Sequence, residues 1–271
     1  MDDNLHSLFL QIKIEEVKKM YRTLEQYKKD IVQVGKELYD KGLLVGTDGN
    51  ISIRTGENEV LITASGLCKG KMQVQHVTKV DMDGKILSGQ KPARDIRMHL
   101  AVYKLKPDIK AVVHAHPPIT TGYAMSEVSF EKVALPEVLF ALQGIAVTGY
   151  TTPTTIEVPI EVTRVLKENP ESETILLANH GALTISKTDV FDAFYKMETL
   201  EMFAKANMVS KMLGHTRYLN EEQMEKVNRL ISGEDPDSVI NPNSVNTKND
   251  VTEDVLNSVV EEVLRRIKRG E

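Results

Sequence analysis

The chain has 271 residues, of which 41% are hydrophobic and 27% charged, a composition typical of a folded globular protein. Its net charge of −5 argues against the broad basic face that nucleic-acid binding needs, and its apolar runs are too short to cross a membrane. The N-terminal residues lack a signal-peptide pattern, and the single cysteine, Cys68, excludes an internal disulfide and a cysteine-based zinc site. We therefore expect a cytoplasmic protein without a nucleic-acid or membrane partner.

Hydrophobic spacing predicts alternating helices and strands along most of the chain. A first helix is expected over residues 5–41, ending at Gly42, which suits the position just after a helix. The remaining predicted elements are strands over residues 50–54, 59–63, 74–80, 111–116, 145–147, 174–178 and 182–185, and helices over 96–105, 156–168 and 189–213.

Composition changes near residue 232, where Asn, Asp, Ser, Pro and Gly become frequent. This composition is typical of a linker. Beyond it, apolar residues recur every four positions at Val255, Val259, Val263 and Ile267, which predicts an amphipathic helix. We therefore expect a domain over residues 1–232, a linker over 233–251, and a terminal helix over 252–271 that docks on its own or a neighbouring subunit.

Three histidines carry the clearest chemical signal. His114 and His116 lie two residues apart in a predicted strand, so their side chains project from the same face. His180 follows another apolar strand and precedes Gly181, where the absence of a side chain lets the backbone approach a ligand closely. Neutral imidazoles suit zinc, and three protein ligands that leave one position open are typical of catalytic zinc.

Asp95 begins the helix that precedes the His114–His116 strand. It is a candidate fourth zinc ligand or base, and equally a helix N-cap, since acidic residues favour that position. The turns over residues 46–50 and 63–66 are rich in glycine and small residues. Such turns either present backbone N–H groups to a phosphate or simply reverse the chain.

Taken in order, these segments resemble the class II aldolase and adducin family over roughly residues 25–232, and within it the fuculose-phosphate aldolase branch. The matching segments are Gly46–Arg54, Ile62–Gly66, Pro92–Asp95 with Arg97–His99, Ala111–Pro117 and Leu176–Leu183. The resemblance implies an α/β fold, with three α/β/α layers around a mainly antiparallel central sheet. It also implies a homotetramer with active sites at subunit interfaces.

The resemblance also implies roles for individual residues. His114, His116 and His180 fall on the family's zinc ligands, one Zn²⁺ per subunit. Asp95 falls where aldolases carry a glutamate that binds zinc and acts as base, and where ribulose-phosphate 4-epimerases carry aspartate. The positions that correspond to phosphate or substrate binding are Gly49, Asn50, Ser65 and Gly66.

Some residues depart from the family pattern. Arg94 stands at one of two positions where relatives commonly carry phosphate-binding serines; its guanidinium can bind phosphate, bind a carboxylate, or face solvent. Glu137 lies where several relatives place an acid/base residue, and is alternatively a solvated helix start. The fuculose-phosphate aldolase branch uses a tyrosine near the end of its last helix as proton donor, and this sequence has no tyrosine at the corresponding place. Tyr150 and Tyr218 are candidate substitutes.

These expectations together predict a zinc-dependent aldolase that cleaves a ketose 1-phosphate to dihydroxyacetone phosphate, or a close analogue, and an aldehyde. Two related enzymes are alternatives, a ribulose-5-phosphate type 4-epimerase and a methylthioribulose-1-phosphate dehydratase. An adducin-like interaction domain is the non-enzymatic alternative. The presence of all three histidines favours an enzyme, because a scaffold has no use for an open metal site.

Overall fold

The computed structural model describes residues 23–126, 130 and 134–234. Contacts divide the chain into two units, with the boundary in the sequence between Val227 and Asn228. The first unit holds the sheet and all the candidate site residues. The predicted helix over 252–271, nearly all of the predicted linker, and the predicted helical residues 5–22 lie outside the described residues.

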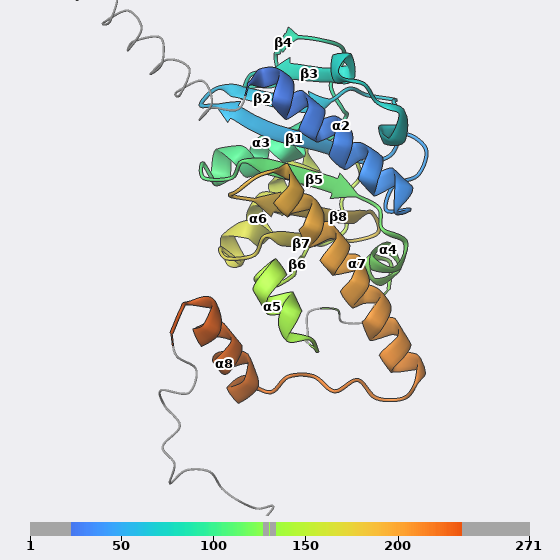
Figure 1. Cartoon of the computed structure of the whole chain (residues 1–271), viewed down its shortest axis with the longest axis vertical. Coiled ribbons are helices and arrows are strands. Elements are labelled where there is room, and N and C mark those ends of the chain that lie inside the picture. Colours follow the sequence, from blue (N-terminus) through green and yellow to red (C-terminus); the bar gives the residue numbers. More distant parts are fainter. Residues whose placement is uncertain (1–22, 127–129, 131–133, 235–271) are drawn as a thin grey trace, which may run out of the picture. The chain divides into compact units, whose positions relative to one another are not determined.

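An eight-stranded sheet forms the centre of the first unit, in the order β4-β3-β2-β1-β5-β8-β7-β6 (Figure 1). Neighbouring strands are antiparallel except β6 and β7, which are parallel. This confirms the predicted, mainly antiparallel sheet. The strands are β1 Asn50–Gly56, β2 Glu59–Thr63, β3 Val77–Val80, β4 Ile86–Ser88, β5 Ala111–Ala115, β6 Ala146–Val147, β7 Thr174–Leu177 and β8 Gly181–Ser186.

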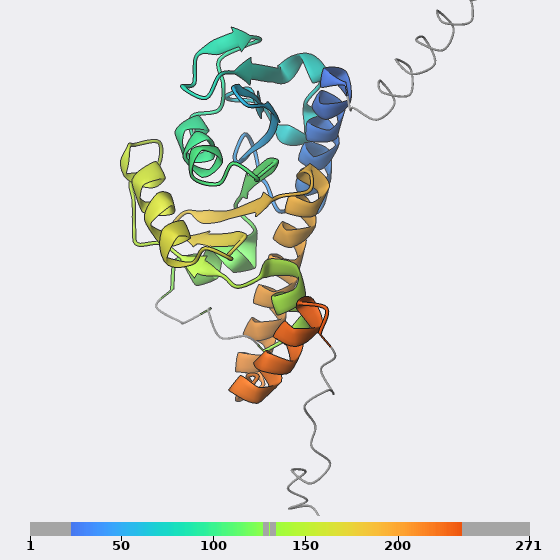
Figure 2. The same cartoon turned by 90° about the vertical axis from the view of Figure 1, so that its left-hand side faces the viewer.

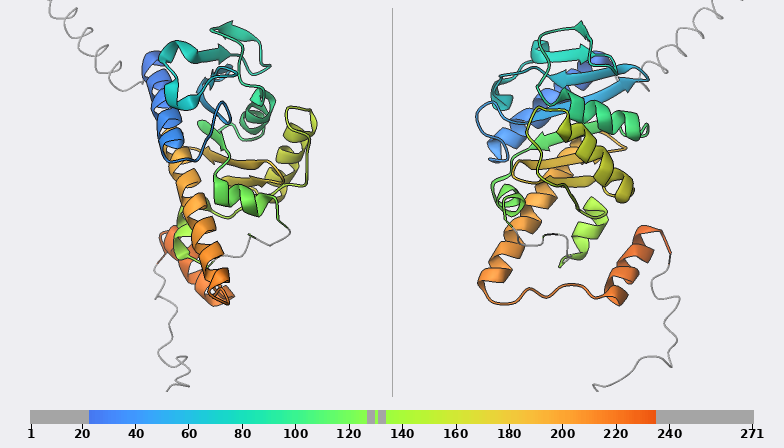
Figure 3. Two further views of the ribbon diagram at one scale, coloured as in Figure 1. Left: turned by 90° about the vertical axis from the view of Figure 1, so that its right-hand side faces the viewer. Right: turned by 180° about the vertical axis from the view of Figure 1, so that it is seen from behind.

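Helices cover both faces of this sheet and make the expected three layers (Figures 1 and 2). The helices α2 (Leu24–Asp40) and α7 (Val190–Met212) lie on one face, and α3 (Ile96–Leu105) and α6 (Glu157–Glu168) on the other (Figure 3). The short helices α4 (Pro118–Ala124) and α5 (Pro136–Leu142) pack against α7, and the chain continues to α8 (Glu221–Ile231). Within the described residues, no helix is both long enough and apolar enough to cross a membrane.

The strand pattern explains why the sheet can be covered on both sides. Successive side chains of a strand point to opposite faces. In β5, Val113 belongs to the hydrophobic core shared with α2 and α7, whereas Val112 belongs to the core shared with α3 and α6. Both cores are built from buried apolar side chains, so the central strands are apolar on both faces.

Most predicted boundaries agree with the structure, and the differences have local causes. The helix α2 begins at Leu24 because Thr23 and Gln26 form a capping box. Val74–His76, predicted as strand, is a 3₁₀ turn (η2) in which the backbone N–H of Gln73 donates to His76 Nδ1 (3.1 Å). Pro118, just beyond the predicted strand over 111–116, opens α4; the first turn of a helix tolerates proline because its missing N–H has no partner there.

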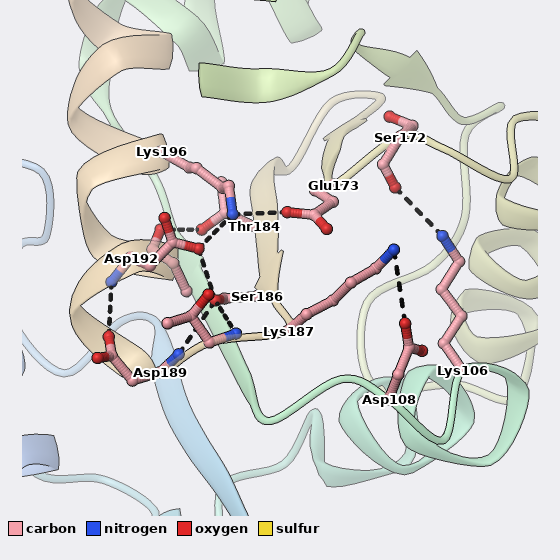
Figure 4. Close-up of polar contacts among 12 residues, drawn as sticks. Lys106, Asp108, Ser172, Glu173, Thr184, Ser186, Lys187, Asp189, Asp192 and Lys196 are labelled. Carbon is pink, nitrogen blue, oxygen red and sulfur yellow. Dashed lines mark hydrogen bonds and ion pairs between the residues drawn. The ribbon is translucent and has the colours of Figure 1, made fainter. Parts of the chain in front are cut away.

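A buried ion pair ties α7 to the sheet (Figure 4). Lys196 Nζ lies 2.6 Å from Glu173 Oε2, and both side chains are over nine-tenths buried. Lys196 also pairs with Asp192, which accepts a hydrogen bond from Ser186 Oγ (2.6 Å). Removing one member of a buried pair leaves an uncompensated charge, which typically costs about 3–5 kcal/mol. This cluster therefore holds the start of α7 against β7 and β8, the strands whose connecting turn carries His180.

Candidate metal centre and substrate pocket

His114, His116 and His180 come together at one end of the central strands. His114 lies in β5, His116 just after it, and His180 in the turn between β7 and β8. One ligand atom from each residue lies within 4.8 Å of the others, and the Nε2 atoms of His114 and His116 are 3.2 Å apart. Tetrahedral zinc with Zn–N bonds of about 2.0–2.1 Å separates its nitrogen ligands by about 3.3 Å. The geometry therefore suits three ligands of one ion.

Glycine at position 181 permits this convergence. A Cβ atom there would lie 2.6 Å from the Ala115 carbonyl oxygen and 2.6 Å from His116 Cδ2. Such contacts are far below normal van der Waals separation, so only glycine lets the β7–β8 turn approach the end of β5. This close approach brings His180 to the two histidines that the strand spacing already pairs.

The three imidazoles are in the form that binds metal. Burial lowers the pKa of His114 well below its ordinary value of 6.5, and burial also lowers the pKa of His116 and of His180. His114 Nδ1 donates to the Ala182 carbonyl oxygen (2.9 Å), which leaves Nε2 unprotonated in the neutral ring. Asp48 Oδ2 lies 3.7 Å from His116 Nδ1, on the ring nitrogen opposite the one that faces His114. Neutral rings are the ligand form of histidine at neutral pH.

Asp95 stands at the N-cap position of α3, but its side chain makes no capping hydrogen bond. Its Oδ2 instead accepts from Asn50 Nδ2 (2.9 Å). Asp95 Oδ1 and His180 Nδ1 are buried and have no hydrogen-bond partner among the described residues. A buried polar atom left unpaired costs about 1–3 kcal/mol. Both residues line one cavity, where a cation would satisfy the carboxylate oxygen, and their nitrogen and oxygen donors suit zinc.

A continuous chain of buried hydrogen bonds reaches Asp95 from inside the α3 core. Asn50 Oδ1 can only accept, so His99 Nε2 donates to it (2.5 Å), and the neutral ring therefore accepts at Nδ1 from Ser52 Oγ (2.7 Å). With its proton committed, Ser52 Oγ accepts from the Tyr103 hydroxyl (2.8 Å). Burial lowers the pKa of His99 to about 3, so the ring is neutral at neutral pH. This Tyr103–Ser52–His99–Asn50 relay orients the Asn50 amide toward Asp95, and leaves Oδ1 of Asp95 free.

The strand register explains how the relay reaches the histidines. Asn50 in β1 lies directly opposite His114 in β5, and Ser52 lies opposite Val112. Paired residues of antiparallel strands present their side chains on the same face. Asn50, Ser52 and His114 therefore share the face that α3 covers, and α3 supplies His99 and Tyr103.

A cavity of about 180 Å³ adjoins the three histidines. All five residues predicted to bind substrate or phosphate line it, as does Asp95; they are Gly49, Asn50, Ser65, Gly66 and Arg94. Gly49 has a φ of +68°, and a Cβ atom there would lie 2.6 Å from the His114 carbonyl oxygen. The turn at Gly49 therefore lies directly against the end of β5, and its role includes this packing.

The structure also places residues that sequence reasoning did not single out. Lys69, Asp48, Pro153 and Thr154 line the cavity. Thr154 has a φ of +67°, a strained conformation for a β-branched residue. Asp48 lies inside the predicted turn over residues 46–50, but no spacing rule connects Lys69 or the loop at Thr154 to the histidines.

Three candidates lie away from this cavity in the single chain. Glu137 is exposed in the first turn of α5 and does not line the cavity. Its acid/base role stays a prediction for the assembled protein. Tyr150 and Tyr218 are 67% and 37% exposed, and neither lines the cavity. The structure therefore gives neither tyrosine a place beside the histidines of the same chain.

The sequence and the fold match one family. The family model described as the Class II Aldolase and Adducin N-terminal domain matches residues 29–208, and the chain belongs to this family. The chain is 32% identical over 184 residues to L-fuculose phosphate aldolase from Methanococcus maripaludis, covering 68% of this chain and 97% of that protein. It is 33% identical over 180 residues to 3-oxo-tetronate 4-phosphate decarboxylase from Haemophilus influenzae, covering 65% and 83%.

Solved structures agree with this assignment. YgbL from Klebsiella pneumoniae aligns with a TM-score of 0.71 and 26% identity, covering 76% of this chain and 100% of that one. An L-fuculose 1-phosphate aldolase aligns with a TM-score of 0.70 and 26% identity, covering 76% and 96%. The family and its fold, predicted from the ordered segments, are therefore confirmed. The decarboxylase is a relative that the sequence segments alone did not suggest.

Proposed function

We propose that this protein is a zinc-dependent aldolase that cleaves a ketose 1-phosphate to dihydroxyacetone phosphate, or a close analogue, and an aldehyde. The observation that carries the proposal is the convergence of three neutral imidazoles beside a carboxylate oxygen that has no partner among the described residues. Class II aldolases use a divalent metal, typically zinc. In this chain His114, His116, His180 and Asp95 would hold it.

When bound, a divalent ion supplies Lewis-acid stabilisation of negative charge on a substrate oxygen, an effect of several kcal/mol. The protein residues would do the rest. Asp95 would take the hydroxyl proton released as the carbon–carbon bond breaks, and return a proton to the three-carbon product. General acid/base catalysis of this kind contributes about 10²- to 10⁴-fold. The turns at Gly49–Asn50 and Ser65–Gly66, with Arg94, would hold the phosphate and so fix which carbon faces Asp95.

We expect a homotetramer with active sites at subunit interfaces, as the family resemblance implies. In such an assembly Glu137 would contribute to the active site of a neighbouring subunit. Exposed apolar side chains on the second half of α7 support a subunit contact there: Met202, Val209 and Met212 are 46%, 45% and 79% exposed. Size-exclusion chromatography with light scattering measures the assembly directly.

A decarboxylase acting on a 3-oxo-tetronate 4-phosphate is the second candidate, because the relative of that name matches as closely as the aldolases do. Product analysis separates the candidates. Triose phosphate released from a ketose 1-phosphate supports the aldolase, whereas carbon dioxide from the oxo acid supports the decarboxylase. If ribulose 5-phosphate yields only xylulose 5-phosphate and no triose, the protein is a 4-epimerase; methylthioribulose 1-phosphate losing water identifies a dehydratase.

Metal analysis tests the centre itself. Protein purified without chelator should hold close to one zinc per chain, and His116→Ala should lose both the metal and the activity while keeping its fold. Asp95→Asn should retain some zinc but lose turnover. Full activity of metal-free His116→Ala, or wild-type turnover by Asp95→Asn, would contradict the assigned roles. Less than about half an equivalent of zinc in the wild type would favour the adducin-like scaffold instead.

A further inference from the structure

Lys69 is a buried cation in the wall of the cavity. It is the first residue of a short 3₁₀ helix, η1 (Lys69–Lys71), just after the Ser65–Gly66 turn, and is only 2% exposed. Its Nζ donates to the carbonyl oxygens of Thr47 and Leu67, both at 2.8 Å. An ammonium group has three protons, and the described residues offer no third acceptor and no ion pair to this one. Buried charges usually have a counterion, so an anionic ligand in the cavity that Lys69 lines would complete the surroundings of this cation.

Close packing against α2 sets the direction of the Lys69 side chain. A Cβ atom at Gly35 in α2 would lie 3.2 Å from the Lys69 carbonyl oxygen, and one at Gly70 would lie 2.4 Å from the ring of Tyr39. The backbone of η1 is therefore seated directly on α2. The Lys69 side chain points away from solvent, across the gap between the two turns that line the cavity.

The charges around the cavity favour an anionic ligand. The basic side chains of Lys69 and Arg94 formally balance the acidic ones of Asp48 and Asp95. A divalent ion at the histidines would leave two positive charges in excess, which matches a phosphate monoester dianion. Burial lowers the pKa of Lys69 to about 8, so the group is mostly protonated at neutral pH.

We propose that Lys69 is a substrate-binding residue whose ammonium group joins the Thr47 and Leu67 loops and contacts the phosphate group of the substrate. The proposal rests on the proposed function and adds a residue to its phosphate site. The two hydrogen bonds to backbone carbonyls hold the glycine turns at a fixed separation before the ligand arrives. The remaining proton is available to a phosphate oxygen between them. A charge-assisted hydrogen bond of this kind is stronger than those from the neutral turn amides.

A matched pair of variants tests this role. Lys69→Met keeps the aliphatic stem and removes the charge and all three donors, whereas Lys71→Met removes an exposed lysine from the same turn. Each protein, loaded with zinc, is titrated with inorganic phosphate by calorimetry. We expect Lys69→Met to bind phosphate at least 10-fold more weakly than the wild type, and Lys71→Met to bind like the wild type. With substrate, KM should rise more than kcat falls. Phosphate affinity of Lys69→Met within about twofold of the wild type would overturn the proposal.

A second measurement uses only the wild-type protein, in case Lys69→Met fails to fold. Lysines of the folded protein are acetylated under limiting conditions, with and without phosphate, and each site is quantified by mass spectrometry. Phosphate should slow acetylation of Lys69 and leave Lys71 unchanged; equal rates at Lys69 with saturating phosphate would refute direct contact. Neither the phosphate titration nor the acetylation measurement depends on turnover. Phosphate binding through Lys69 without cleavage of any sugar phosphate would therefore reject the aldolase and retain the subsite.

Discussion

Replacing His99 by leucine tests the relay that holds Asp95. Leucine fills much of the same space but removes two hydrogen bonds from the middle of the chain, those to Asn50 Oδ1 and Ser52 Oγ. Asn50 Oδ1 then loses its partner in a fully buried position, while Ser52 keeps Tyr103. One unpaired buried acceptor costs about 1–3 kcal/mol, so the free energy of unfolding should fall by about that amount.

The same change should weaken the metal centre, although His99 lies outside the set of metal-binding candidates. Without His99 the Asn50 amide can rotate, and Asp95 loses the hydrogen bond that fixes its orientation. Loss of such outer partners typically lowers metal affinity or activity about 10- to 100-fold. Tyr103→Phe is the matched control, because it removes one hydrogen bond of about 1 kcal/mol at the far end and leaves the Asn50–Asp95 contact in place.

Urea denaturation measures the stability of both variants, and competition with a chromophoric chelator measures their zinc affinity. His99→Gln, which can still donate to Asn50, should recover part of the affinity lost in His99→Leu. Zinc affinity of His99→Leu equal to that of the wild type would show that the relay serves only the core. Equal losses of zinc affinity in His99→Leu and Tyr103→Phe would likewise refute a role for the Asn50 orientation.

Two further predictions concern stability. Burial lowers the pKa of His99 from 6.5 to about 3. Below pH 6.5 the His99 ring is therefore protonated in the unfolded chain but stays neutral in the folded protein. Metal-free protein should therefore lose about 2 kcal/mol from this residue between pH 7 and pH 5 in urea denaturation; constant stability over this range would contradict the assignment. Gly49→Ala would place a Cβ atom 2.3 Å from Leu44 Cδ2 at a φ of +68°, and should cost about 2–5 kcal/mol. Gly42→Ala, with a φ of +71° and no atom within 4 Å, should cost only about 1–2 kcal/mol; equal losses would exclude the packing explanation.

Much of the fold follows from local patterns in the sequence. The helix over 96–105 was predicted with the bounds of α3, because its apolar spacing and the following Pro107 define both the element and its end. The strand carrying His114 was predicted to within one residue, over 111–116 against Ala111–Ala115, since a continuous apolar run is typical of a central strand. Local patterns failed where a side chain competes with the strand, as His76 does by accepting from the Gln73 N–H.

The sequence also predicted that His114 and His116 lie side by side, because residues two apart in extended backbone share a face. His116 follows the last residue of β5, and the Nε2 atoms of the two rings are 3.2 Å apart. The sequence did not decide what Asp95 does, since an acidic residue at a helix start fits an N-cap and a ligand equally well. In the structure Asp95 makes no capping hydrogen bond, and its Oδ2 instead accepts from Asn50 Nδ2.

Only the tertiary structure brought distant segments into one site. The antiparallel register of β1 and β5 sets Asn50 opposite His114, and the packing of η1 on α2 turns Lys69 into the cavity. No periodic pattern in the sequence indicates either arrangement, because each depends on how elements far apart in the chain pack together. The sequence therefore determined which side chains can bind a metal, and the packing of the elements decided which of them meet.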